Sequence, residues 1–194
     1  MASHINEAPQ LLLETRWIAM SLKDVFQSYL NEMEWEDEIQ HDEDANSDYI
    51  VTQYSIDDQA YTLQLSTHED RQQLKILMQS PISIPQKRFD VACQIVNFIN
   101  ARMPVGNLEI GENGIVYYRW SIDVEGSNAA TMQFKKMVAA AGNAFDQIRA
   151  PAIVAAALTK QNVKEITDAY IESLEVLSKS ETQEDGNDNA PSSL

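Results

Sequence analysis

The chain has 194 residues, of which 44% are apolar, and a formal net charge of −16 at pH 7. This length and composition suit one compact domain with appended segments, and they exclude a chain too polar to build a core. The negative charge disfavours nucleic acids and anionic membrane surfaces as partners, because both are bound through clusters of lysine and arginine.

Features missing from the sequence predict where the protein works. A single cysteine, Cys93, allows no disulfide within the chain. The N-terminus lacks the basic and apolar segments of a secretory signal peptide. The longest apolar run, residues 152–158, is far shorter than the ~20 residues that cross a bilayer. We therefore expect a cytoplasmic protein.

The N-terminal quarter predicts an extension, a helix and an acidic loop. Residues 1–19 contain only a short apolar run, so we expect an N-terminal extension. From Ser21 to Met33, apolar residues recur at spacings of three and four, which indicates an amphipathic helix. Ser21 followed by Asp24 forms a weak capping-box pattern. The next segment, residues 34–48, is dense in acids and predicts a solvated loop.

Three strand-like runs follow, and each alternates apolar with polar residues. Their apolar residues are Ile50, Tyr54 and Ile56, then Tyr61, Leu63 and Leu65, then Leu74, Ile76 and Met78. Polar turns at residues 57–58 and 68–70 separate the runs, and Pro81 ends the third. Short strands joined by tight polar turns indicate an antiparallel meander.

A helix and a second hairpin are predicted beyond the meander. The pattern favours a helix over residues 86–103, with Cys93 on its apolar face. The turn Asn113-Gly114 then predicts a hairpin, because both residues tolerate the positive φ angles of a tight turn. The outgoing strand of that hairpin covers residues 115–124.

The last third predicts helices followed by a tail. The helical pattern over residues 129–158 contains Pro151, which must kink or break it because proline cannot donate the helical hydrogen bond. A further helix is expected over residues 163–178. Residues 179–194 hold no large apolar residue except the last, and they predict a disordered acidic tail.

The resulting element order is α-β-β-β-α-β-β-α with an extra C-terminal helix. We therefore predict an α+β fold in which one antiparallel sheet has helices packed on one face. The predicted division is an N-terminal extension (1–19), an α+β domain (20–158), an additional helix (159–178) and the tail (179–194).

No motif predicts a metal or a cofactor. Residues 42–46 have the opening spacing of a calcium-binding loop, but Ser47 and Gln53 stand where that loop needs glycine and glutamate. A glycine-rich phosphate loop is also missing from the sequence. We therefore expect no metal and no cofactor.

No constellation predicts catalysis either. The histidines His4, His41 and His68 lie far apart and are expected in polar surface loops or at the terminus. Cys93 is expected to pack in the core as a small apolar residue, since a catalytic thiolate needs an exposed, electropositive setting and a histidine partner. We expect no catalytic residues, so the protein is predicted not to be an enzyme.

The predicted sheet leaves one face for a partner. If helices cover the face bearing Tyr54, Leu63, Ile76 and Trp120, the opposite face carries tyrosines, aliphatic residues and an arginine among polar residues. Such a composition is typical of interfaces, although an ordinary mixed surface is the alternative. The candidate partner-binding residues are Tyr49, Val51, Leu77, Tyr117 and Arg119.

Six segments carry a resemblance to a known family. They are Tyr29–Glu32, Tyr61–Leu65, Leu74–Met78, Asn97–Asn100, Gly106–Ile110 and Gly114–Arg119. Through them, residues 25–158 resemble the YbjN family, described as bacterial sensory-transduction regulators. That family is similar to type III secretion chaperones, which share the element order predicted above. The resemblance implies a homodimer that binds a partner polypeptide and uses no known cofactor.

Two functional hypotheses follow. The first is a non-enzymatic protein-binding module, either a chaperone-like adaptor or a regulator in bacterial signalling, whose partner the sequence does not name. The alternative is a small-ligand sensor with a pocket between sheet and helices. That pocket would be lined by Tyr54, Met78, Trp120 and Phe134.

Overall fold

One six-stranded antiparallel sheet organises the computed structural model, which describes residues 20–126, 129–147 and 149–184. The strands are β1 (Gln40–Asp42), β2 (Ser47–Ile56), β3 (Gln59–His68), β4 (Gln73–Ser83), β5 (Asn107–Ile110) and β6 (Ile115–Asp123), in the order β1-β2-β3-β4-β6-β5. The helices are α1 (Leu22–Glu32), the 3-10 segment η1 (Gln86–Arg88), α2 (Phe89–Asn100), α3 (Thr131–Ala144), α4 (Arg149–Leu158) and α5 (Val163–Glu184). The predicted extension (1–19) and residues 185–194 of the predicted tail lie outside the described residues.

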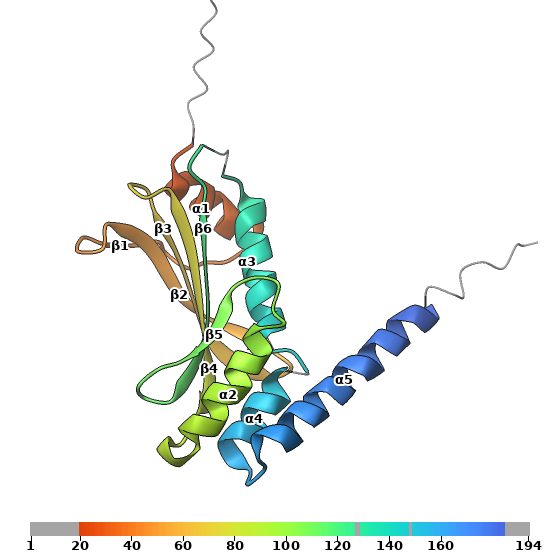
Figure 1. Cartoon of the computed structure of the whole chain (residues 1–194). Coiled ribbons are helices and arrows are strands. Elements are labelled where there is room, and N and C mark those ends of the chain that lie inside the picture. The colour runs from red at the N-terminus through yellow and green to blue at the C-terminus, as the bar shows by residue number, and fades with distance from the viewer. Residues whose placement is uncertain (1–19, 127–128, 148, 185–194) are drawn as a thin grey trace, which may run out of the picture.

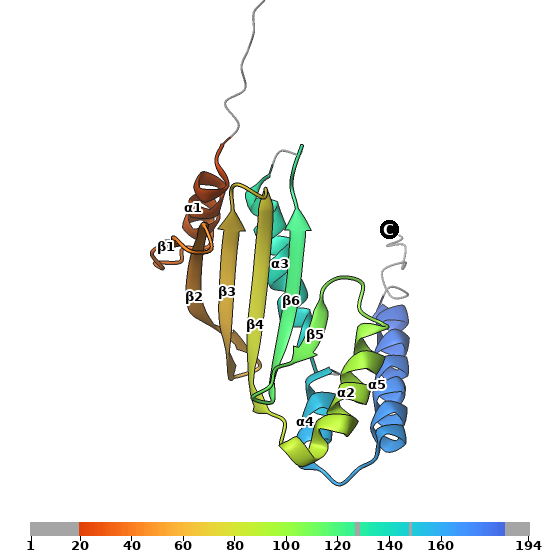
Figure 2. The same cartoon turned by 60° about the vertical axis from the view of Figure 1, so that its left-hand side comes forward.

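Among the described residues, the helices cover one face of the sheet and leave the other face uncovered. Figure 1 views the sheet nearly edge-on, with the helices gathered on one side. Figure 2 turns the uncovered face of β2, β3, β4 and β6 toward the viewer. Helix α1 packs against α3, while α2, α4 and α5 form a second group next to β5. The prediction of an α+β fold with helices on one face of an antiparallel sheet is confirmed.

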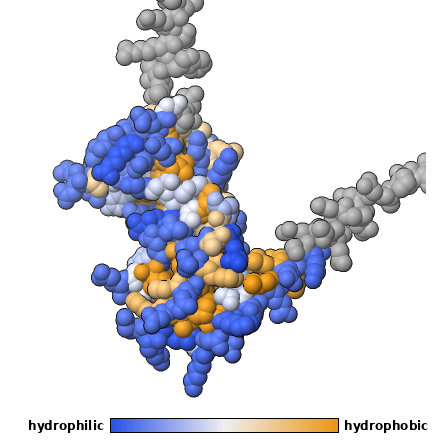
Figure 3. Space-filling view, in the orientation of Figure 1, coloured by the Kyte–Doolittle hydropathy of each residue, from blue (hydrophilic) through white to orange (hydrophobic). Residues whose placement is uncertain are grey.

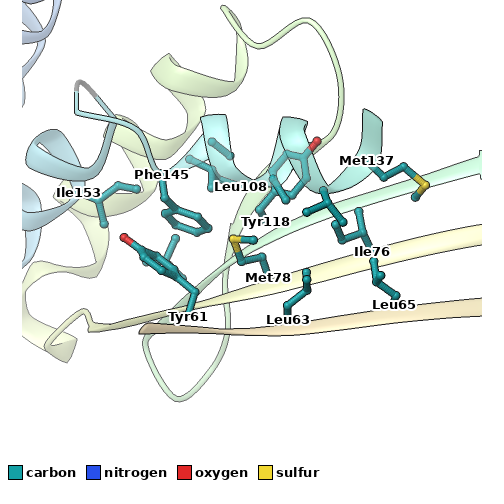
Figure 4. Close-up of a cluster of buried hydrophobic side chains, with 14 of the residues drawn as sticks. Tyr61, Leu63, Leu65, Ile76, Met78, Leu108, Tyr118, Met137, Phe145 and Ile153 are labelled. Atoms are coloured by element: carbon teal, nitrogen blue, oxygen red, sulfur yellow. The ribbon is translucent and has the colours of Figure 1, made fainter. Parts of the chain in front are cut away.

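Alternation along the strands directs apolar side chains toward the helices. The fully buried members include Leu63, Leu65, Leu74, Ile76, Met78 and Tyr118. Figure 4 shows Met78 next to Phe145, and Ile76 and Leu65 nearer to Met137 of α3. Each such burial contributes roughly 1.5–3 kcal/mol relative to exposure. On the helical side, the Phe134 ring stacks on both Phe26 and Tyr29, with centroids 4.9 and 5.1 Å apart, and joins α3 to α1.

Local signals explain where α1 begins and where the β5–β6 hairpin turns. The Ser21 Oγ accepts the Asp24 amide at 3.1 Å and donates to the Asp24 carboxylate at 2.7 Å, so the Ser21 cap is confirmed. Gly114 has a φ of +81°, and a Cβ there would lie 2.3 Å from the Ile84 carbonyl oxygen. The predicted Asn-Gly hairpin is therefore confirmed, and only glycine fits its second position.

Three strand and helix boundaries differ from the prediction. Residues 40–42 form β1 inside the predicted acidic loop, because they pair with the start of β2. Strand β4 continues through Pro81 to Ser83, and its register with β6 shifts after Gln79. Pro81 lies in this irregular part, where a residue without an N–H group costs no hydrogen bond between the strands. Helix α2 ends at Asn100, three residues earlier than expected.

The predicted break in the long helical region is confirmed, but it does not lie at Pro151. Helix α3 ends at Ala144 and α4 begins at Arg149, so the break precedes the proline. Pro151 lies in the first turn of α4, where a backbone N–H has no helical partner to lose. The prediction for the tail is also wrong in part, since α5 continues through residues 179–184.

The prediction that Cys93 packs in the core is wrong, because its side chain is exposed. The buried face of α2 consists of Ala92, Ile95, Val96 and Ile99. Helix α2 packs against α4, α5 and β5. These long-range contacts turn Ile95 inward and leave Cys93 on the outer side.

Candidate functional site

The uncovered side of the sheet presents three neighbouring rows of side chains across β2, β3, β4 and β6. The first row is Tyr49, Ser66, Lys75 and Ser121, the second is Val51, Gln64, Leu77 and Arg119, and the third is Gln53, Thr62, Gln79 and Tyr117. We call the residues of these rows the open face. The register therefore brings all the predicted partner-binding residues onto one surface: Tyr49, Val51, Leu77, Tyr117 and Arg119.

Apolar and aromatic groups on the open face remain accessible. The Val51 side chain is 50% exposed, and Tyr49, Leu77 and Tyr117 are half-buried. Arg119 is exposed, and its Nε lies 3.2 Å from Glu109 Oε2 on β5. The open face thus combines aliphatic, aromatic and cationic groups, which together provide apolar area and directional contacts.

A hollow of about 370 Å³ lies on the open face, and we call it the polar hollow. Its floor is formed by the first and second rows, and the loop between β1 and β2 forms one side. The side chains that define it are Asp42, Ser47, Ser66, His68, Lys75 and Arg119. Ser47, Ser66 and His68 are each only 7% exposed, so this wall holds buried polar groups.

His68 lies in the wall of the polar hollow, and its predicted place in a surface loop is wrong. It ends β3 and is covered by the β1–β2 loop, whose Ala45 carbonyl forms a hydrogen bond with the ring. Burial is the largest cause that lowers the pKa of His68, followed by the charge of Lys75. The ring is therefore neutral near pH 7, and its Nδ1 has no hydrogen-bond partner among the described residues.

Lys75 places a positive charge on the floor of the polar hollow. Burial lowers the pKa of its ammonium group, and the nearby cations Arg71 and Arg119 lower it further. Within the described residues, Lys75 has no salt bridge to a carboxylate. An unpaired, partly buried ammonium group is a favourable position for an anionic ligand atom.

None of the hollows described among residues 20–126, 129–147 and 149–184 is lined by more than one of the residues predicted to line a sensor pocket. Met78 and Phe134 have no exposed surface and belong to the packed core. Tyr54 instead lines an open hollow of about 620 Å³ next to Gly142 of α3. Trp120 is half-buried and packs against the core.

The part of the chain that the structure describes holds no group of three or more His, Cys, Asp or Glu side chains that could bind a metal ion. In the segment with calcium-like spacing, Asp42 Oδ1 accepts the Ala45 amide at 3.0 Å, so it stabilises its own turn. No helix among the described ranges is long and apolar enough to cross a membrane.

The polar hollow could not be predicted from the sequence. Lys75 falls on the correct face by alternation, but nothing local distinguishes it from a solvated lysine. His68 falls at the start of a predicted turn, three residues after the last apolar residue of its run, so its burial has no local signal. The hollow arises because the β1–β2 loop lies over the end of β3, and only the fold reveals that contact.

The fold and the open face define a class of protein: a two-layer α+β domain whose antiparallel sheet has helices on one face and, among the described residues, leaves the other face uncovered. The model of the YbjN family, described as "Putative bacterial sensory transduction regulator", matches residues 23–153. The chain belongs to the YbjN family, and the resemblance of the sequence to that family is confirmed.

The chain was also compared with curated protein sequences and with solved structures. No curated protein sequence matches the chain. Among solved structures, one chain of the "HopA1-SchA Chaperone-Effector Complex" is similar, with 18% identity and a TM-score of 0.39. The match covers 61% of this chain and 85% of that chain.

Proposed function

We propose that this chain is a non-enzymatic protein-binding module that holds a partner polypeptide against its open face. It would act as a chaperone-like adaptor or regulator in bacterial signalling, in the cytoplasm. The observation that carries the proposal is the uncovered face of the sheet, where Val51 and Leu77 share a row flanked by the rows of Tyr49 and Tyr117. The description of the YbjN family supports a regulatory role.

The geometry of the open face suits one bound segment. Neighbouring rows on one face of a sheet lie about 7 Å apart along the strands, so a single extended or helical segment reaches all three. Tyrosine and arginine side chains carry much of the binding energy at protein interfaces. Val51, at 50% exposure, supplies apolar area that a partner would remove from water.

The test is quantitative co-purification from lysate of the source cells, with the wild-type chain and a Val51→Asp variant as bait. A carboxylate in the middle of the open face must be desolvated when the partner binds, and that cost weakens the complex. We expect the wild-type chain to recover a stable partner and the Val51→Asp variant to lose it.

The matched control is Met132→Asp, which introduces the same charge at an exposed apolar residue of α3, on the helical side. This control should retain the partner, and both variants should keep the wild-type melting temperature. A Val51→Asp variant that recovers the partner as well as the wild type contradicts the proposed surface.

We further propose that the protein is a homodimer that associates through the exposed apolar residues of α5 between Ile171 and Leu177. Ile171, Val176 and Leu177 there are 39%, 62% and 45% exposed, and Figure 3 shows apolar surface along α5 where it leaves the domain. Light scattering should give twice the monomer mass for the wild type and the monomer mass for Val176→Asp. A wild-type monomer at all concentrations contradicts this proposal.

A further inference from the structure

The polar hollow contains features that a general protein-binding surface does not require. We propose that it is a carboxylate-binding site, in which Lys75 and Arg119 hold an aspartate or glutamate side chain of the bound polypeptide. This inference rests on the proposed function, because the bound polypeptide presents the carboxylate. It adds the chemistry by which the open face selects a partner.

Two cations, Lys75 and Arg119, line the polar hollow. The chain has 30 acidic residues against 14 lysines and arginines, yet Lys75 forms no salt bridge within the described ranges. Arg119 lies on the adjacent strand in the next row, a diagonal position that long side chains can bridge. A carboxylate placed between these two cations would complete a pair of charge-assisted hydrogen bonds.

Polar groups surround the two cations, and Ser47, Ser66 and His68 among them are buried. Ser66 and Ser121 flank Lys75 in its row, and both line the polar hollow. The Nδ1 of the neutral His68 ring is a buried acceptor without a partner among the described residues. A peptide brings N–H donors as well as a carboxylate, so it would satisfy an acceptor that a simple anion leaves unpaired.

The same features disfavour a phosphate group. Phosphate sites commonly use a helix N-terminus or several arginine forks. The lining residues of the polar hollow belong to strands and to the β1–β2 loop, and none belongs to a helix. The carboxylate of Asp42 also lines the hollow, and the Nε of Arg119 already forms a salt bridge with Glu109. This limited positive charge suits a single negative charge better than a dianion.

The experiment selects random peptides displayed on phage against the full-length protein. Peptides are kept if their binding is lost in Val51→Asp, because those peptides occupy the open face. Each is then synthesised twice, once as selected and once with every acidic residue replaced by its amide. Calorimetry measures the dissociation constants of both forms for the wild type and for Lys75→Gln, Lys75→Arg and Lys87→Gln.

We expect the selected peptides to contain an acidic residue. Losing one partner of a charged hydrogen bond weakens binding about 10-fold or more, so the amide form and Lys75→Gln should each show that loss. The two losses should not add, because they remove the same contact. Lys75→Arg should retain most of the affinity, and Lys87→Gln, at an exposed lysine outside the hollow, should bind like the wild type.

Two failures are distinguishable. Peptides that need Val51 but bind Lys75→Gln and the wild type equally would overturn the carboxylate site and leave the proposed function standing. Selection that yields no peptide sensitive to Val51→Asp would overturn the open face as a binding surface, and the carboxylate site with it.

Discussion

At the scale of single residues, two fully buried tyrosines differ in whether their hydroxyl groups have partners. The Tyr118 hydroxyl donates to the Val105 carbonyl at 3.3 Å, whereas the Tyr29 hydroxyl has no partner in the described part of the chain. Tyr118→Phe should therefore lower the free energy of unfolding by about 1 kcal/mol, while Tyr29→Phe should leave it unchanged or raise it. Urea unfolding measures both, and the reverse order would contradict this assignment.

The same two tyrosines make stability sensitive to alkaline pH. Burial raises the pKa of both Tyr29 and Tyr118 to about 12, against about 10 in an unfolded chain. Their protonated hydroxyls stabilise the fold fully below pH about 10, and this contribution is lost as pH rises toward about 12, because the unfolded state ionises first. The loss amounts to at most about 3 kcal/mol for each tyrosine.

The corresponding measurement is the free energy of unfolding as a function of pH. It should fall between pH about 10 and 12 in the wild type, and less steeply in the Tyr29→Phe/Tyr118→Phe double variant. Tyr61 and Tyr170 also have pKa values raised by burial, so some slope should remain. An equal slope in both proteins would contradict the role of the two hydroxyls.

At the scale of elements, one arginine ties the start of α2 to the end of α4. Arg88 donates through Nε to the Ala156 carbonyl and through Nη2 to the Gln161 carbonyl, each at 2.8 Å. Carbonyls at the C-terminal end of a helix have no helical partner, so a cation there stabilises the helix.

Arg88→Ala should therefore lower the free energy of unfolding by about 2 kcal/mol. Arg88→Lys should restore only part of the lost stability. The single ammonium nitrogen of lysine cannot bind both carbonyls as the planar guanidinium group does. Lys87→Ala, at the exposed neighbouring position, is the control and should change stability by less than about 0.5 kcal/mol. An equal effect of the two alanine variants would contradict this tie.

Elements with a local signal could be predicted from the sequence, and those that depend on distant contacts could not. Alternation and the Asn113-Gly114 turn predict the main strands because a strand buried on one face must alternate. The periodicity of a helix does not determine which residues at the edge of its apolar face are buried. In α2, Ile95 is buried and Cys93 is exposed, the reverse of the prediction. Pro151 predicts a break but not its side, since both a preceding and a following break satisfy proline.

The same division applies to the candidate site. Alternation alone places Tyr49, Val51, Leu77, Tyr117 and Arg119 on one face, and the strand register agrees. The polar hollow needed two further facts: the order of the strands and the position of the β1–β2 loop over His68. Both are long-range properties with no signal in a short stretch of sequence.

At the scale of the whole molecule, charge is distributed unevenly across the sheet. Between Asp24 and Asp70 the sequence contains no lysine or arginine, and this stretch supplies β1, β2 and β3. Lys75 and Arg119 lie on β4 and β6, at the other side of the open face. A partner with an acidic residue over β4 and β6 and basic residues toward β1 would match this distribution of charge. The electrostatic attraction would orient the partner as it approaches the open face.

The central claim is that partners bind the open face and not the helical side. Methyl NMR of the full-length protein tests this most directly, with a recovered partner or a selected peptide added. We predict that the methyl resonances of Val51 and Leu77 shift on binding, while those of Val138 and Ile153 in the helical layer do not. Shifts confined to the helical layer or to Val176 of α5, with Val51 and Leu77 unchanged, would contradict the claim.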